Sequence, residues 1–65
     1  MKLYYVEYYY NNGIEQCTSY KYVFAENPDH IQKLLEEYYN DPLDIIKVTH
    51  YAEQNIQEGV FKFKN

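Results

Sequence analysis

Aromatic and β-branched residues are concentrated in two stretches near the start of the chain, residues 2–10 and 14–25. Both stretches are rich in Tyr, Val, Phe and Thr, which are typical of β-strands. Asn11-Asn12-Gly13 separates them, and Asn12-Gly13 suits the centre of a type I′ turn because Asn and Gly tolerate positive φ. The sequence therefore predicts a β-hairpin.

The register of this hairpin depends on the length of its loop. A two-residue turn at Asn12-Gly13 pairs positions whose numbers sum to 25. A three-residue loop would instead shift the pairing by one and exchange the two faces of one strand. With the two-residue turn, the expected pairs are Leu3 with Tyr22, Tyr5 with Tyr20, Val6 with Ser19 and Tyr8 with Cys17.

A helix is expected next, between Asn27 and Asn40. Asn27-Pro28-Asp29 supplies a capping side chain, a proline suited to the first helical position and an acid near the positive end of the dipole. The pattern then predicts an apolar stripe and a polar face, and Asn40-Asp41-Pro42 ends the helix. The stripe comprises Ile31, Leu34, Leu35, Tyr38 and Tyr39, and the polar face Gln32, Lys33, Glu36 and Glu37.

Two further strands complete the expected architecture, one over residues 43–51 and a short one over residues 60–64, with a polar connection at 52–59. A right-handed crossover through the helix places the third strand beside the first. We therefore expect an α+β fold: a single ββαββ domain over residues 1–65, with a four-stranded antiparallel sheet of order 2-1-3-4 and one helix on one face.

The two faces of that sheet differ in what covers them. The helix is expected to cover one face, where Ile31, Leu34, Leu35 and Tyr38 pack on Tyr4, Val6, Tyr8, Val23, Ala25, Ile46 and Val48. The other face remains open and carries Leu3, Tyr5, Tyr9, Tyr20, Tyr22 and Phe24. Most antiparallel sheets turn polar residues outward, whereas this one is aromatic on both faces. Contiguous exposed apolar patches commonly mark interaction sites.

Composition narrows the class of protein. The chain has 65 residues, a net charge of −4, no Trp, a single Cys and ten Tyr. A chain this short buries only about 60% of its unfolded surface, which leaves little room for a deep active site. The acidic balance argues against a general nucleic-acid binder. The absence of a disulfide framework, a signal segment or a long apolar run indicates a soluble protein of the cytoplasm.

Four segments carry a resemblance to a known group: residues 1–8 (MKLYYVEY), 23–27 (VFAEN), 34–38 (LLEEY) and 45–48 (IIKV). They are similar to small strand, strand, helix, strand proteins of phages, plasmids and conjugative elements, the DpnD/PcfM-like group among them. The resemblance spans residues 1–50 and carries over no functional residue. It implies an accessory protein of a mobile element, a class that includes compact acidic inhibitors of host defence enzymes.

The residues capable of catalysis or metal binding are few. Cys17, His30 and His50 are the only thiol and imidazole groups, and none has the spacing of a metal or nucleophile site. We expect Cys17 to be a buried or half-buried structural thiol, His30 to be solvated, and His50 to line the sheet or the open face in a structural role. Gly13 and Gly59 form no phosphate-binding loop. The sequence therefore predicts no enzyme, no metal and no cofactor.

The open face remains as the candidate binding site, and its expected residues are Leu3, Tyr5, Tyr9, Tyr20, Tyr22 and Phe24. Tyrosine offers rigid, amphipathic contact area, so a protein partner is expected, with a homodimer as one form. The acidic balance favours a basic partner, such as a nucleic-acid-handling enzyme. Two alternatives stay open: a base-stacking platform for single-stranded nucleic acid, and a purely structural role in which the tyrosines build a polar-edged core.

Overall fold

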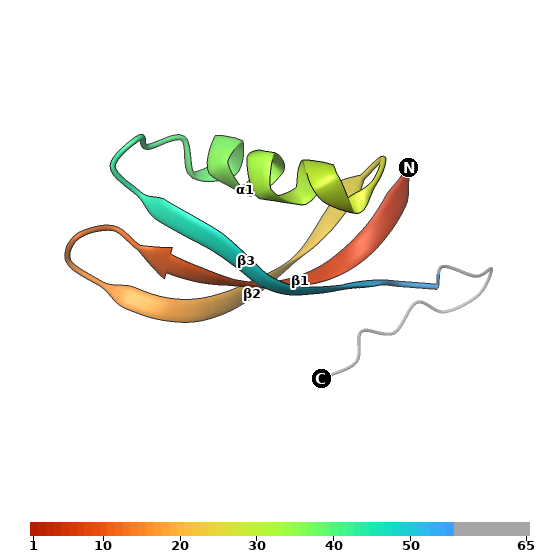
Figure 1. Cartoon of the computed structure of the whole chain (residues 1–65), viewed down its shortest axis with the longest axis horizontal. Helices are drawn as coiled ribbons and strands as arrows, with labels where there is room; N and C mark the ends of the chain where they lie inside the picture. The colour runs from red at the N-terminus through yellow and green to blue at the C-terminus, as the bar shows by residue number, and fades with distance from the viewer. Residues whose placement is uncertain (56–65) are drawn as a thin grey trace.

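The computed structural model describes residues 1–55 (Figure 1). A three-stranded antiparallel sheet and one helix make up this part of the chain, so the α+β class is confirmed. The predicted strand at 60–64 lies outside the described residues. The elements in chain order are β1 (Lys2–Asn11), β2 (Gln16–Ala25), a 3₁₀ turn η1 (Pro28–His30), α1 (Ile31–Tyr39) and β3 (Ile45–Glu53).

The sheet has the order β2-β1-β3, and β1 runs antiparallel to both of its neighbours. The predicted placement of the third strand beside the first is therefore confirmed. The strand itself begins and ends two residues later than expected, because residues 41–44 form a turn in which the Asp44 amide donates to the Asp41 carbonyl at 3.0 Å. The helix lies across one side of this sheet (Figure 1).

The hairpin register differs from the prediction by two residues. The paired positions sum to 27, so Leu3 lies opposite Phe24 and Tyr5 opposite Tyr22. Among residues 1–55, Asn40 is the sole non-glycine residue with positive φ, so Asn12 cannot take part in a type I′ turn. The corrected partners of the other two predicted pairs are Lys21 for Val6 and Ser19 for Tyr8.

Asparagine side chains explain the wider loop. The Asn12 Oδ1 accepts from the amides of Ile14 and Glu15 at 2.9 and 2.7 Å, and the Asn11 Oδ1 accepts from Gly13 at 2.8 Å. These bonds satisfy the loop amides that a tighter turn would satisfy through the backbone. A shift of two residues keeps every side chain on its predicted face, because strand side chains alternate with a period of two.

The helix begins and ends at the predicted signals. Asn27 has extended backbone angles, and its Oδ1 accepts from the Asp29 amide at 2.9 Å, which caps η1 ahead of α1. Asn40 adopts the left-handed conformation, with φ 53°, and its amide donates to the Glu36 carbonyl at 3.0 Å. That conformation ends the helix, since a left-handed residue cannot continue a right-handed one.

The covered face of the sheet holds the core as predicted, but the helix turns a different stripe toward it. Leu34 is 37% exposed and Tyr38 is 67% exposed, so neither belongs to the core. Tyr39 packs against the core instead, and Gln32 turns toward the sheet. The buried cluster comprises Tyr4, Val6, Tyr8, Ala25, Ile31, Leu35 and Ile46, with Tyr10, Val23, Tyr39 and Val48 partly buried against it.

Candidate functional site

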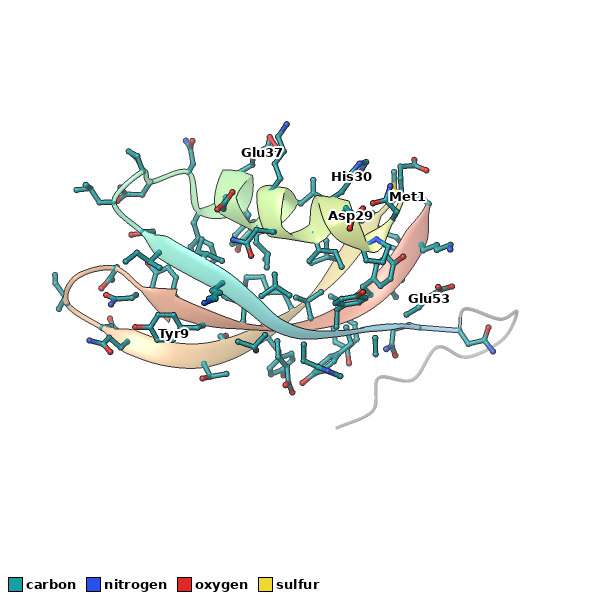
Figure 2. The ribbon with its side chains drawn as sticks, viewed as in Figure 1. Met1, Tyr9, Asp29, His30, Glu37 and Glu53 are labelled. Atoms are coloured by element: carbon teal, nitrogen blue, oxygen red, sulfur yellow. The ribbon has the colours of Figure 1, made fainter. Side chains whose placement is uncertain are left out.

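The side of the sheet opposite the helix forms the candidate site, and we name it the open face. No element within residues 1–55 covers it (Figure 1), and side chains project from this side of the strands in Figure 2. Directly paired residues of antiparallel strands share a face, so the register defines its rows. From the hairpin end they are Gln16-Asn11-Ile45, Thr18-Tyr9-Lys47, Tyr20-Glu7-His50, Tyr22-Tyr5-Ala52 and Phe24-Leu3.

Three tyrosines form the centre of the open face. The Tyr5 ring lies 5.8 Å from Tyr20 and 5.6 Å from Tyr22, measured between ring centroids, and Tyr20 and Tyr22 are 6.5 Å apart. Tyr5 and Tyr22 are edge-on at 62°, and Tyr20 and Tyr22 are nearly perpendicular at 89°. These spacings are those of favourable aromatic pairs, so the rings hold one another in fixed orientations.

A carboxylate lies within this aromatic cluster. The Tyr5 hydroxyl donates to Glu7 Oε2 at 2.7 Å, and both residues are half-buried. That hydrogen bond, with burial and the negative charge of Glu7, raises the pKa of Tyr5 to about 12. Glu7 lies between Tyr20 and His50 in the sheet. The open face therefore combines aromatic rings with an anionic acceptor.

The exposure of the predicted site residues decides which can contact a partner directly. Tyr20 and Phe24 are 60% and 58% exposed, whereas Tyr5, Tyr9 and Tyr22 are half-buried. Leu3 is 6% exposed, so little of its side chain is open to direct contact. Its row lies next to the chain segment after β3, where the Gln54 amide donates to the Leu3 carbonyl at 2.8 Å.

Tyr9 lies at the hairpin end of the open face (Figure 2). Its hydroxyl donates to Gln16 Oε1 at 3.2 Å and accepts from Asn11 Nδ2 at 3.1 Å. Tyr9 therefore bonds to polar side chains of the hairpin, whereas the three central tyrosines contact one another through their rings. Tyr9 is thus fixed to the hairpin and forms a second, more polar part of the surface.

Glu7 and His50 are open-face residues that the aromatic pattern did not single out. A β-bulge between Glu7 and Tyr8 leaves Thr49 without a directly opposite partner, and it moves His50 to the open face and Tyr51 to the helix side. The Thr49 hydroxyl donates to the Glu7 carbonyl at 3.2 Å at this point. Alternation alone places His50 on the face that holds Ile46, so only knowledge of the bulge could have located it.

A second tyrosine cluster lies on the helix side. Tyr8 and Tyr39 share a hydroxyl hydrogen bond, Tyr39 stacks on Tyr10 with centroids 4.7 Å apart, and the Tyr10 hydroxyl donates to Asp44 at 3.0 Å. Burial raises the pKa of both Tyr39 and Tyr10. The hydrogen bond of Tyr39 with Tyr8, and that of Tyr10 with Asp44, raise these pKa values further. These hydroxyls bond within the fold, so this cluster is structural.

Cys17, His30 and His50 lie on three different elements of the described chain: β2, the 3₁₀ turn η1 and β3. Cys17 is exposed at the hairpin end of β2, so the prediction of a buried thiol is wrong. The wider loop is the reason, because it pairs Cys17 with Tyr10 close to the loop instead of with Tyr8. His30 is exposed as expected. Within residues 1–55, no set of three or more His, Cys, Asp or Glu side chains is placed to hold a metal ion.

No helix in the described part of the chain is long and apolar enough to cross a membrane. Comparisons of the chain with protein families, with curated proteins and with solved structures found no match. The resemblance to DpnD/PcfM-like proteins therefore stays a prediction, and so do its implications.

Proposed function

We propose that this protein is a small non-catalytic binding module whose open face contacts a protein partner. The observation that carries the proposal is the contiguous aromatic cluster of Tyr5, Tyr20 and Tyr22, continued by Phe24, on a sheet face that no element of residues 1–55 covers. Tyrosines dominate binding hot spots because they bury a large area and lose little side-chain entropy. The rings are already oriented by one another, which lowers the cost of binding further.

The charge of the surface favours a basic partner. Glu7 accepts one hydrogen bond from Tyr5, and a carboxylate has further lone pairs for a Lys or Arg of the partner. Tyrosine faces also attract cations through their ring quadrupoles. The net charge of −4 steers the chain in the same direction. Under this proposal, the partner is a basic protein such as a nucleic-acid-handling host or defence enzyme, which the module modulates or inhibits.

The resemblance found in the sequence supplies the proposed setting, an accessory protein of a phage or other mobile element acting in the cytoplasm. The same proposal keeps the fourth strand at 60–64 beside β3, which gives the order 2-1-3-4. A strand there extends the sheet without needing the open face.

The test uses a photo-crosslinking residue on each side of the sheet. We expect p-benzoylphenylalanine at position 5 to capture a protein in host cells, and the same residue at position 38, on the helix and 67% exposed, to capture none. With the captured protein purified, Tyr5→Ala and Tyr20→Ala should each weaken its binding by about 2 kcal/mol or more, roughly 30-fold. Binding isotherms at fixed salt provide the measurement.

The control is His30→Ala, an exposed residue at the start of the helix (Figure 2). It should leave binding unchanged. Equal capture from both positions, or unchanged affinity in the tyrosine variants, would contradict the proposal. Binding of an unstructured oligothymidine that is lost in Tyr5→Ala would support the single-stranded nucleic-acid alternative instead, because stacking on aromatic rings tolerates any base.

A further inference from the structure

The two edges of the described sheet differ in their exposure to other chains. At the β3 edge, the Gln32 side chain donates to the Ile46 carbonyl, and its Oε1 accepts from the Val48 amide at 2.9 Å. The side-chain amide thereby satisfies the outward-facing backbone groups of Ile46 and Val48, in the first half of β3. At the β2 edge, no element of residues 1–55 makes an equivalent contact. Edges of this kind are templates for pairing with another chain.

The register shows which backbone groups the β2 edge presents. The Asn12 amide donates to the Glu15 carbonyl at 3.1 Å, so this pair is hydrogen-bonded across the hairpin. Hydrogen-bonded and non-hydrogen-bonded pairs alternate along antiparallel strands. The backbone N–H and C=O groups of Gln16, Thr18, Tyr20 and Phe24 consequently point away from β1. Their side chains lie on the open face.

The charge of β2 sets it apart from the rest of the chain. None of the ten acidic residues lies within Gln16–Ala25, although Glu15 and Glu26 flank the strand at its two ends. The single charge inside β2 is Lys21, whose Nζ lies 4.8 Å from the Tyr38 ring centre on the helix side. Two copies of an acidic chain therefore repel one another least along this edge.

We infer that two copies of the chain join through their β2 edges as an antiparallel, two-fold symmetric pair centred on Tyr20. This register pairs positions whose numbers sum to 40, so Gln16 meets Phe24 of the other copy and Tyr20 meets the other Tyr20. The contact uses the edge rather than the open face and does not depend on the function proposed above. The described strands of the two copies then form one continuous sheet with the order β3-β1-β2-β2-β1-β3.

Charge favours the register centred on Tyr20 over the register centred on Lys21. Centring the pair on Lys21 places the two lysines directly opposite each other, which is unfavourable across a strand pair. Centring it on Tyr20 places Lys21 opposite Ser19 of the other copy. The same register brings Cys17 opposite Val23 in a non-hydrogen-bonded pair, where Cα atoms lie about 4.5 Å apart. That separation is within the range that a disulfide spans.

The exposed thiol of Cys17 makes the register testable. With oxidised glutathione as the oxidant, Val23→Cys should form a covalent dimer through two symmetry-related bridges, each transferring two electrons and two protons to glutathione. Positions 17 and 23 of one copy are about 20 Å apart along the strand, so an intramolecular bridge is impossible. The matched controls are the wild type and the Cys17→Ser/Val23→Cys variant, and both should stay uncrosslinked.

A charge pair tests the same contact without relying on a substitution near the core. Ser19→Lys places a lysine opposite Lys21 twice in the dimer and should raise its dissociation constant about tenfold. Ser19→Glu should lower it severalfold. Sedimentation equilibrium of the wild type at high micromolar concentration should show the dimer. Only monomer in the wild type, equal crosslinking of the control variants, or equal effects of the two Ser19 substitutions would overturn the inference.

Discussion

The two faces of one sheet use the same residue type for different ends. On the helix side, Tyr4 and Tyr8 are 1% and 0% exposed, and they form the core together with aliphatic residues. On the open face, Tyr20 is 60% exposed, and the Tyr5 hydroxyl bonds to a carboxylate beside it. Composition alone reports ten tyrosines and cannot separate these roles. Position relative to the helix makes the distinction.

The hydroxyl partners sharpen the contrast. Tyr8 and Tyr39 share a hydroxyl hydrogen bond, and the Tyr10 hydroxyl donates to Asp44. The Tyr10 and Tyr39 rings also contact each other, so the polar groups of this cluster are satisfied within the fold. Tyr5 bonds to Glu7, a half-buried residue of the open face. The first arrangement stabilises one packing of the helix on the sheet. The second leaves an acceptor and ring faces available to a partner.

The largest expected effect separates the faces by stability. Tyr4→Ala should lower the free energy of unfolding by about 3–5 kcal/mol, because it removes a fully buried aromatic ring and leaves a cavity. Tyr20→Ala should lower it by less than about 1 kcal/mol, since most of that ring is already in water. Urea denaturation followed by circular dichroism measures both values.

Tyr4→Phe is the matched control for that comparison. The Tyr4 hydroxyl is buried and makes no hydrogen bond to any group within residues 1–55, so its removal costs no interaction there. We expect the phenylalanine variant to be as stable as the wild type or more stable. If Tyr20→Ala destabilised the fold as much as Tyr4→Ala, the open face would belong to the core and the contrast between the faces would be wrong.

The elements and the two faces were predictable from sequence, because they follow from periodicity and capping residues. The helix begins after Asn27 and ends at Asn40 as expected, and the order of three strands is confirmed. The hairpin register was not, because the side chains of Asn11 and Asn12 build a loop that propensities do not specify. The error in register did not change which side chains lie on each face, because the shift was an even number of residues.

The candidate site was predictable only in part. Its aromatic members followed from alternation along β1 and β2. Glu7 lies on the same face by the alternation of β1, but a search for aromatic residues passes over it. The position of His50 required the bulge between Glu7 and Tyr8, which leaves no mark in the pattern of hydrophobic residues. On the other side, Gln32 looked like part of a polar face, and its bonds to Ile46 and Val48 arise only once the helix and β3 are placed.

A smaller effect on stability is expected from the hydrogen bonds between the helix and the edge of β3. Gln32→Ala removes the contacts to Ile46 and Val48 and should lower the free energy of unfolding by about 1 kcal/mol. The Val48 amide should also exchange with solvent faster. Gln32→Glu should keep the amide slow, because the carboxylate still accepts its hydrogen bond. Lys33→Ala, an exposed neighbour, provides the control. Unchanged exchange at Val48 in Gln32→Ala would contradict the assignment.

The smallest expected effect is the contribution of Tyr5, on the open face, to an alkaline loss of stability. Tyr5 has a pKa of about 12 in the fold, chiefly through its hydrogen bond to Glu7, against the ordinary value of 10.0. Between these values the unfolded chain releases the proton that the folded chain keeps. The stabilisation is therefore complete below pH 10 and is lost as the pH rises toward 12.

The chemical shift of the Tyr5 Cζ carbon reports this titration directly. Glu7→Gln should move the Tyr5 pKa down toward 10.0, whereas Glu37→Gln, on the outer side of the helix (Figure 2), should leave it unchanged. An unchanged Tyr5 pKa in Glu7→Gln would show that Tyr5 does not donate to this carboxylate. It would thus contradict the role of Glu7 as an anionic acceptor beside the tyrosines of the proposed surface.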